Sequence, residues 1–338
     1  MIDRRFYACL GPVSALELAA EAGSGVVEGG EDRQVSSVAP SLEAGPDDLS
    51  FLEDRSPDAL RQVRAGICFV RPETLSGRRD GTTCIVSERP RAAFARASER
   101  IFRRIDFQPG DPAIHPTARI EAGAKILPGC VIGAGAAIGS GATIGPNAVI
   151  GPGVQIGWRS RIGAGASVSC ALIGDDVILL AGVAIGETGF GLAQHADGAR
   201  LTPHFGRVIL QNGVTIGANS CVDRGLFDDT VIGEGSHIDN LCHIGHNVRI
   251  GRHAVMAAFA GVSGSSIVGD GAQFGGRVGL GDHIVVGRGA RIAAGAAVLK
   301  DVAEGETVAG YPAKPSRTWM RELAWLAREA QKRGSKDD

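Results

Sequence analysis

Two histidines, His246 and His283, are the side chains of this chain best suited to chemistry. A neutral imidazole accepts a proton near neutral pH, so a histidine that stands clear of the core can act as a general base. His246 lies two residues after Ile244, at an outward position of the repeat described next. Whether the two histidines can act together depends on the fold that positions them.

A six-residue repeat runs from Ile114 to Val298. In each hexad an aliphatic residue is usually followed by glycine, and a small residue comes four positions after it. A strict hexapeptide period is typical of a parallel β-helix, whose coils bury their apolar faces only against one another. Three hexads make one triangular coil of eighteen residues. The repeat therefore predicts a mainly β fold, a prism with the aliphatic residues inside and the small residues near its corners.

The period converts sequence distance into position on the prism. His246 and His283 are 37 residues apart, which is two coils and one residue. Coils stack through parallel strand hydrogen bonds at roughly 4.8 Å each, so the two side chains should project about 10 Å apart along the axis. That is a span that a substrate could bridge.

A metal site is the alternative chemistry for the histidine-rich segment, because His237, His243 and His246 are close in sequence. Histidines six residues apart fall on different faces of a triangular coil. Zinc needs three or four ligands that converge at about 2.0–2.1 Å. We therefore expect no metal ion at these residues within one chain.

Composition excludes several classes of protein. The 338 residues carry a formal net charge of −2, which gives no bulk attraction to nucleic acid. The N-terminal sequence lacks the apolar core of a secretory signal, and no stretch of about 18 apolar residues could span a membrane. Seven cysteines are scattered, and Cys130 and Cys242 occupy the small-residue position of the repeat. We expect reduced cysteines and a cytoplasmic location.

The sequence divides into three parts. Residues 1–108 carry no hexads and predict a small α/β domain, residues 109–312 the β-helix, and residues 313–338 a C-terminal helix and tail. The terminal helix should begin at Ser316, end at Gly334 and be basic and amphipathic. In the first part we expect helices over Val13–Ala22 and Pro90–Arg103, and strands around Val35–Val38, Leu49–Leu52, Ile67–Val70 and Thr83–Val86.

The repeat is interrupted twice, between Ile185 and Leu210 and between Val222 and Ile232. A solenoid tends to extrude its insertions on one face, often the binding face. Long loops inside a regular scaffold are usually functional. We therefore expect the two interruptions to border the functional site.

With these interruptions the chain resembles the UDP-3-O-acylglucosamine N-acyltransferase family of hexapeptide-repeat acyltransferases over nearly its whole length. The resemblance rests on four pieces of sequence: Ala39–Leu52, Gly189-Phe190-Gly191 with Gly206-Arg207-Val208, the run from Ile216 to Thr230, and Ile238-Asp239-Asn240 with Ile244–Val248. It implies a left-handed β-helix, a uridine-binding N-terminal domain, and a homotrimer with active sites at the subunit interfaces.

The resemblance also implies a reaction. A 3-hydroxyacyl group would pass from acyl carrier protein to the 2-amino group of UDP-3-O-acyl-glucosamine, a step of lipid A synthesis, with no cofactor beyond that co-substrate and no covalent enzyme intermediate. His246 matches the general base. Gly264, one coil further on, matches the oxyanion-binding N–H, and His283 matches the second active-site histidine, which helps to position substrate.

Further residues match the substrate contacts of the family. Phe51 matches the aromatic residue that contacts uracil, although a core position in a strand is the alternative. The family often continues after Phe-Leu with Asn-Pro-Lys-Tyr. This chain reads Glu53-Asp54-Arg55-Ser56-Pro57 instead and lacks the tyrosine. The departure leaves open how Asp54 contacts the nucleotide and how the nucleotide is bound. The other expected substrate contacts are Gly189, Phe190, Asp239 and Asn240. Asp239 is also a candidate for orienting a nearby histidine.

The expected partners are a UDP-sugar and acyl carrier protein, whose acidic surface would suit the basic terminal helix. The acceptor could be glucosamine or a 2,3-diamino sugar. Alternatives on the same solenoid are an acetyl-CoA-dependent nucleotide-sugar N-acetyltransferase, the first-step O-acyltransferase of lipid A synthesis, a γ-class carbonic anhydrase and a non-catalytic scaffold. The O-acyltransferase has little sequence before its solenoid and a larger helical end.

Overall fold

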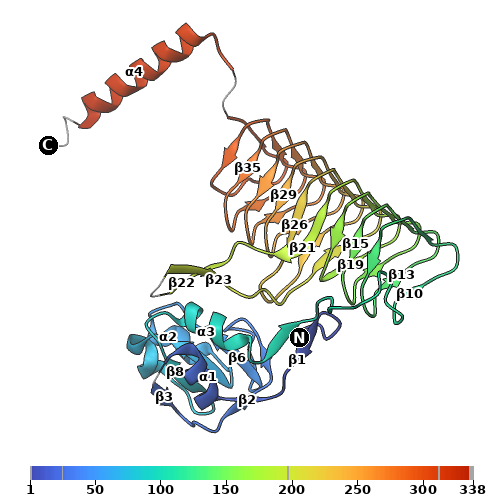
Figure 1. Ribbon diagram of the computed structural model, residues 1–338. Helices are drawn as coiled ribbons and strands as arrows, with labels where there is room; N and C mark the ends of the chain where they lie inside the picture. The colour runs from blue at the N-terminus through green and yellow to red at the C-terminus, as the bar shows by residue number, and fades with distance from the viewer. Residues whose placement is uncertain (1, 25, 196–197, 311–312, 335–338) are drawn as a thin grey trace.

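The computed structural model describes residues 2–24, 26–195, 198–310 and 313–334. A long solenoid forms the body of the molecule, with a small α/β domain against one of its sides (Figure 1). The terminal helix α4 (Ser316–Gly334) lies apart from both, and it begins and ends where the sequence predicts. Tyr311 and Pro312, near the predicted end of the β-helix, lie outside the described residues.

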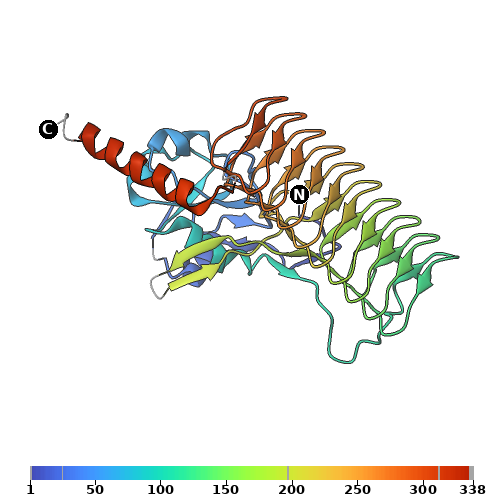
Figure 2. The same ribbon diagram turned by 90° about the horizontal axis from the view of Figure 1, so that it is seen from above.

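The solenoid consists of three parallel sheets with nine, ten and nine strands (Figure 2). One sheet runs from β10 (Arg119–Ile120) to β36 (Val285–Val286), the second from β11 (Lys125–Ile126) to β39 (Thr307–Val308), and the third from β12 (Val131–Ile132) to β38 (Ala297–Val298). Most of these strands are two residues long. Ile120 pairs with Ile138, and Ile126 with Ile144, so each aliphatic residue lies one coil from its equivalent. The predicted parallel β-helix is confirmed.

The aliphatic residues form the core of the prism. Ile132, Ile138, Ile144 and Ile150 are buried, and the thiols of Cys130 and Cys242 fill space beside them. The first two repeat positions are exceptions, because Ile114 and Ile120 are 44% and 38% exposed. They lie in the first coil, where no coil precedes them to cover that end of the prism.

The N-terminal domain is built on a five-stranded sheet with the order β3-β8-β7-β6-β5. Its elements are β1 (Tyr7–Cys9), β2 (Val13–Ser14), α1 (Ala15–Ala22), β3 (Val26–Glu28), β4 (Gln34–Val35), β5 (Ser37–Val38), β6 (Asp48–Phe51), α2 (Pro57–Gln62), β7 (Ile67–Val70), the 3-10 helix η1 (Pro72–Gly77), β8 (Thr83–Val86), α3 (Pro90–Ser98) and β9 (Phe102–Arg104). The four strand regions expected from the sequence are all present. The boundary near residue 108 falls between β9 and β10.

Two expected helix boundaries are wrong. The helix expected over Val13–Ala22 begins at Ala15, because Ser14 caps it with a reciprocal hydrogen bond to Glu17. The helix expected over Pro90–Arg103 ends at Ser98. Phe102–Arg104 pair instead with β1 in an antiparallel ladder, so the predicted helix overran into a strand.

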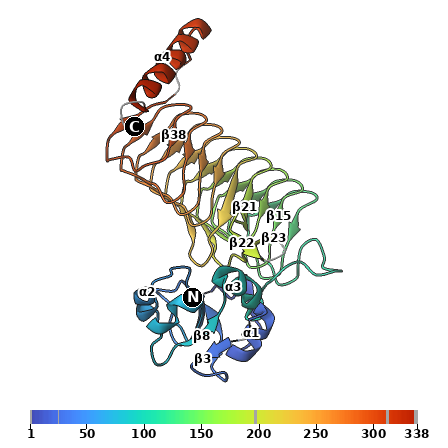
Figure 3. The ribbon, with the colours of Figure 1, turned by 90° about the vertical axis from the view of Figure 1, so that its left-hand side faces the viewer.

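The first interruption of the repeat forms an antiparallel hairpin, which the sequence did not predict. After β21 (Ala184–Thr188), the strands β22 (Leu192–His195) and β23 (Gly198–Leu201) leave the prism, and β24 (Val208–Leu210) rejoins it. Ala193 of the hairpin packs on Ala92 and Ala95 of α3. The hairpin thus joins the solenoid to the N-terminal domain (Figure 3).

Polar contacts fix the N-terminal domain against the solenoid. The Tyr7 hydroxyl donates to the His204 carbonyl at 2.8 Å. Arg207 donates to both carboxylate oxygens of Asp229, at 2.9 and 2.8 Å, and to Asp3 at 2.8 Å. These contacts converge near the second interruption, the loop between β26 (Cys221–Arg224) and β27 (Thr230–Ile232).

None of the described helices combines the length and apolar character needed to cross a bilayer. All seven cysteines are free thiols, and five of them are buried.

Candidate active site

A cleft of about 460 Å³ lies between the solenoid and the N-terminal domain. Three successive strands of one sheet supply most of its wall: β29 (His243–Ile244), β32 (Gly261–Val262) and β35 (Gly279–Leu280). The corner after each strand carries His246, Gly264 and His283 in turn. The residues that line the cleft are Arg91, Phe190, Gly191, Leu192, Asp223, His243, Gly245, His246, Ser263, Gly264, Asp282 and His283.

His246 and Gly264 are in close contact, one coil apart. A Cβ atom placed on Gly264 would lie 2.7 Å from both Nε2 and Cε1 of the His246 ring. The stack is fixed by backbone hydrogen bonds, since Ser265 N donates to His246 O at 2.8 Å and His283 N donates to Gly264 O at 3.1 Å. The Gly264 N–H has no acceptor within the described part of the chain, and so it can donate to a bound oxygen.

The hydrogen bonds of Asn247 define the tautomer of His246. Leu226 N donates to Asn247 Oδ1 at 2.9 Å, which identifies that atom as the amide oxygen. His246 Nδ1 lies 3.1 Å from the same oxygen, so Nδ1 carries the proton that it donates there. Nε2 therefore holds the free lone pair, and it is the nitrogen that faces Gly264. A base arranged in this way is ready to accept a proton.

A buried carboxylate, Asp223, lies beside the histidines. It stands on β26, the strand that pairs with β29, and its Oδ2 is 3.7 Å from His243 Nε2. Burial raises the pKa of Asp223, while the charges of His243 and His246 act in the opposite direction. Asp223 thus places a negative charge beside the two imidazoles.

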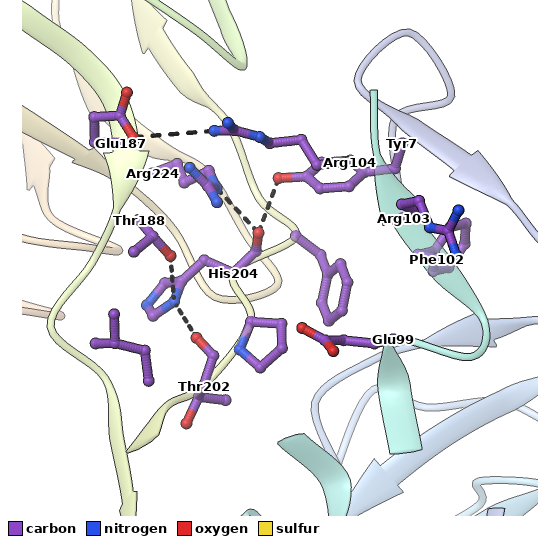
Figure 4. A pocket seen from close by; sticks show the side chains of 13 residues that line it. Tyr7, Glu99, Phe102, Arg103, Arg104, Glu187, Thr188, Thr202, His204 and Arg224 are labelled. Atoms are coloured by element: carbon purple, nitrogen blue, oxygen red, sulfur yellow. Dashed lines mark hydrogen bonds and ion pairs between the residues drawn. The ribbon is translucent and has the colours of Figure 1, made fainter. Parts of the chain in front are cut away.

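His204, whose ring touches that of His246, lines a second cavity of about 540 Å³ (Figure 4). The two imidazole rings meet edge to face with centroids 5.2 Å apart. His204 Nδ1 donates to the Thr202 carbonyl at 2.8 Å, and its buried Nε2 has no partner among the described residues. Burial lowers the pKa of His204 to about 4, so this ring is neutral at physiological pH.

Gly189 and Phe190, predicted from the sequence as substrate contacts, lie at the cleft. A Cβ on Gly189 would come within 2.7 Å of His246 Cβ and 2.9 Å of His204 Nε2. Only glycine allows the chain to pass this close to both rings. Phe190 lines the cleft with a side chain that is 76% exposed. Their contact with substrate stays a prediction.

Phe51 and Asp54 lie on the N-terminal domain, outside the lining of the cleft. The half-buried Phe51 ring packs on Phe94 of α3 and on Phe227 of the second interruption, at centroid distances of 5.0 and 6.3 Å. The Asp54 carboxylate accepts a hydrogen bond from Ser56 N at 2.7 Å, just before α2. The predicted roles of both residues in nucleotide binding remain predictions.

Asp239 and Asn240 lie at a different corner of the prism, after β28 (His237–Ile238). Asp239 accepts hydrogen bonds from Asn240 N at 2.7 Å and Ala258 N at 3.1 Å, and Asn240 Oδ1 accepts one from Ala218 N at 2.6 Å. Within the described chain Asp239 makes these backbone contacts, and its expected role in orienting a histidine stays a prediction. The carboxylate beside the histidines is Asp223, which lies in the run from Ile216 to Thr230 and was not predicted as a site residue.

His237 and His243 belong to strands of different sheets, as the repeat predicts. Among the described residues there is no group of three or more His, Cys, Asp or Glu side chains that could hold a metal ion.

The prism, its exposed histidines and the glycine N–H beside them define a hexapeptide-repeat transferase. Models of the bacterial transferase hexapeptide match residues 111–146, 135–170 and 229–264, and the hexapeptide repeat of succinyl-transferase matches residues 266–300. The model of UDP-3-O-(3-hydroxymyristoyl) glucosamine N-acyltransferase matches residues 32–100, within the N-terminal domain.

Similarity to curated relatives extends over the whole chain. A UDP-3-O-acylglucosamine N-acyltransferase of Caulobacter vibrioides is 54% identical, over 99% of this chain and 100% of the relative. One of Methylobacterium sp. is 42% identical, over 100% and 99%. The chain belongs to the UDP-3-O-acylglucosamine N-acyltransferase family. This match favours the predicted enzyme over the acetyltransferase, O-acyltransferase, carbonic anhydrase and scaffold alternatives.

Proposed function

We propose that the protein transfers a 3-hydroxyacyl group from acyl carrier protein to the 2-amino group of UDP-3-O-acyl-glucosamine, with His246 as the general base. The observation that carries this proposal is the contact between His246 Nε2 and Gly264, in a chain of this family. His246 Nε2 provides a lone pair that can accept a proton, and Gly264 provides an N–H that can donate a hydrogen bond. In this proposal both act on the same reacting carbonyl and amine.

In the first step the amine nitrogen attacks the thioester carbonyl, and His246 Nε2 takes the proton that the amine loses. Such proton transfer typically contributes about 10²–10⁴-fold to the rate. Asn247 keeps Nδ1 protonated, so the incoming proton goes to Nε2. The Asp223 carboxylate stabilises the imidazolium that results.

Negative charge develops on the former carbonyl oxygen, and the Gly264 N–H stabilises it by about 3 kcal/mol if typical of such donors. The intermediate then collapses, the C–S bond breaks, and the thiolate leaves with the proton from His246. An amide forms and no bond to the enzyme is made. His283, two coils beyond His246, positions the sugar.

The proposal includes a homotrimer. Asp239 and Asn240 cannot reach the cleft of their own chain, so contact with substrate requires that a neighbouring subunit bring that corner to the site. Acyl carrier protein would approach from the cytoplasm and dock on α4, where Arg317, Arg321 and Arg328 provide positive charge for an acidic partner.

A mass-spectrometric assay tests the proposal. The purified protein is incubated with UDP-3-O-acyl-glucosamine or its 2,3-diamino analogue and a series of 3-hydroxyacyl carrier proteins, with acetyl-CoA as the alternative donor. We expect N-acylation with the carrier protein only. His246→Ala should abolish transfer but should still form a trimer, as measured by light scattering. The control variant His115→Ala, at the far end of the solenoid, should retain transfer activity. Near-wild-type turnover by His246→Ala would overturn the assignment of the base.

A further inference from the structure

We propose that Arg91 binds the diphosphate of the nucleotide-sugar acceptor and thereby couples the N-terminal domain to the catalytic cleft. The inference rests on the proposed function for the identity of the acceptor. It adds a binding residue that the resemblance to the family did not provide.

Arg91 brings the N-terminal domain into the catalytic cleft. It stands in the first turn of α3 and lines the same cleft as His246, Gly264 and His283. No other described residue of that domain lines the cleft. Its guanidinium lies against Gly191 of the first interruption, because a Cβ on that glycine would be 3.3 Å from an Arg91 terminal nitrogen. The side chain is 28% exposed, so it is accessible to a ligand.

Charge in the cleft makes Arg91 distinctive. The other ionisable groups of this chain that line the cleft are two carboxylates, Asp223 and Asp282, and three histidines. Arg91 is thus the only permanent cation among the described lining residues. A diphosphate brought into this cleft would meet repulsion from the carboxylates, and Arg91 is the group that can offset it.

The hydrogen-bonding capacity of Arg91 is largely unused. Its nearest carboxylate, Glu53, is 3.8 Å away and half exposed, which is too long for a hydrogen bond. Its Nε is buried and has no partner among the described residues. A bound anion would meet the terminal nitrogens of the guanidinium, because the side chain is partly exposed. A planar guanidinium is also suited to paired phosphate oxygens.

The position of Arg91 fits the path of the acceptor. Arg91 and Phe94 are three residues apart on α3 and so lie on the same side of the helix. Phe94 packs on Phe51, the predicted uracil contact. Arg91 thus stands on the helix that contacts the predicted uracil residue and also lines the cleft of His246, where a diphosphate would join nucleoside to sugar.

A ligand series tests this inference. Binding of uridine, UMP and UDP is measured by calorimetry for the wild type, Arg91→Gln and Arg100→Gln. Arg100 is a matched control, because it is an exposed arginine of the same domain with a loose partner, Glu21, at 3.9 Å. We expect Arg91→Gln to weaken UDP binding by about ten- to hundredfold, because charged hydrogen bonds to phosphate are lost. UMP binding should weaken by a smaller factor, and uridine binding should hardly change. Arg100→Gln should match the wild type.

The opposing outcomes are distinct. Unchanged UDP affinity in Arg91→Gln would overturn the inference. A loss of uridine affinity equal to the loss of UDP affinity would also overturn it, because that result indicates a damaged nucleoside site. The carrier protein also bears a phosphate on its prosthetic group. If Arg91→Gln raised only the KM of the acyl donor, the phosphate would belong to the donor and the inference would be wrong. Glu53→Gln should tighten UDP binding, because it removes the competing carboxylate.

Failure of the proposed function is separable from failure of this inference. If the wild type bound UDP in an Arg91-dependent manner but acylated no UDP-sugar, the proposed reaction would fail and the diphosphate site would stand. If transfer occurred and Arg91→Gln left the KM for the UDP-sugar unchanged, the reaction would stand and the site would fail.

Discussion

Gly264 lies against the imidazole of His246, one coil away, and leaves no room for a Cβ atom between them. A methyl group at residue 264 would approach Nε2 and Cε1 at 2.7 Å, well inside van der Waals contact. The contact arises from the eighteen-residue coil, which places both residues at successive levels of the same corner.

Gly264→Ala should therefore disable the site without unfolding the prism. The backbone N–H remains, but the His246 ring must move, and displacement of a catalytic group by about 1 Å costs about 10²-fold in rate. We expect such a fall in kcat/KM with a melting temperature close to that of the wild type. The control is Gly261→Ala in the same coil, where an added Cβ has no neighbour within 4 Å. Equal activity of the two variants would contradict this account.

Asp223→Asn should slow the reaction while the fold stays intact. The Asp223 carboxylate lies 3.7 Å from His243 Nε2, and its charge attracts the imidazolium that forms when His246 takes the amine proton. We expect kcat/KM to fall by about tenfold or more, because the imidazolium formed in the transition state loses its counter-charge. The melting temperature should stay close to that of the wild type. An unchanged kcat/KM would show that Asp223 does not stabilise the transition state.

Arg207→Gln should loosen the N-terminal domain. Burial alone would raise the pKa of Asp3, but hydrogen bonds from Arg5 and Arg207 hold it well below its usual range. Loss of the charged hydrogen bond from Arg207 to Asp3, which joins the solenoid to the domain, should cost about 1.5–3 kcal/mol of docking free energy. Limited proteolysis between residues 105 and 118 should become faster.

The matched control is Arg159→Gln. Arg159 forms the same kind of two-bond pair with Asp176, at 2.8 and 2.6 Å, but on the exposed surface of the solenoid. Exposed pairs contribute only about 0–1 kcal/mol, so proteolysis of this variant should match the wild type. Similar cleavage rates in both variants would show that the Arg207 cluster does not hold the domain.

The period of the repeat determined how well the sequence predicted the site. His246, Gly264 and His283 were placed at one corner because sequence distance in a regular coil is a measure of height. The same period places Asp239 at another corner of its own chain: it is seven residues before His246, about one hexad, and a hexad leads to the next corner. His204 and Arg91 could not be placed, because a hairpin and a separate domain bring them to His246 and no period links their positions.

His204→Gln should make the protein more resistant to acid than the wild type. The buried His204 ring has a pKa of about 4, against about 6.5 in the unfolded chain. Between these values the unfolded state binds the extra proton, so the wild type loses stability as the pH falls from about 6.5 to about 4, and no further loss from this group occurs below that. The loss should reach about 2 kcal/mol at pH 5, and a glutamine at this position removes it.

Denaturant unfolding at pH 7.5 and pH 5 measures the difference in the free energy of unfolding. The control is His253→Gln, which replaces an exposed histidine of the solenoid and should follow the wild type. Parallel pH dependence in the wild type and His204→Gln would mean that folding does not lower the pKa of His204, and the effect assigned to its burial would be wrong.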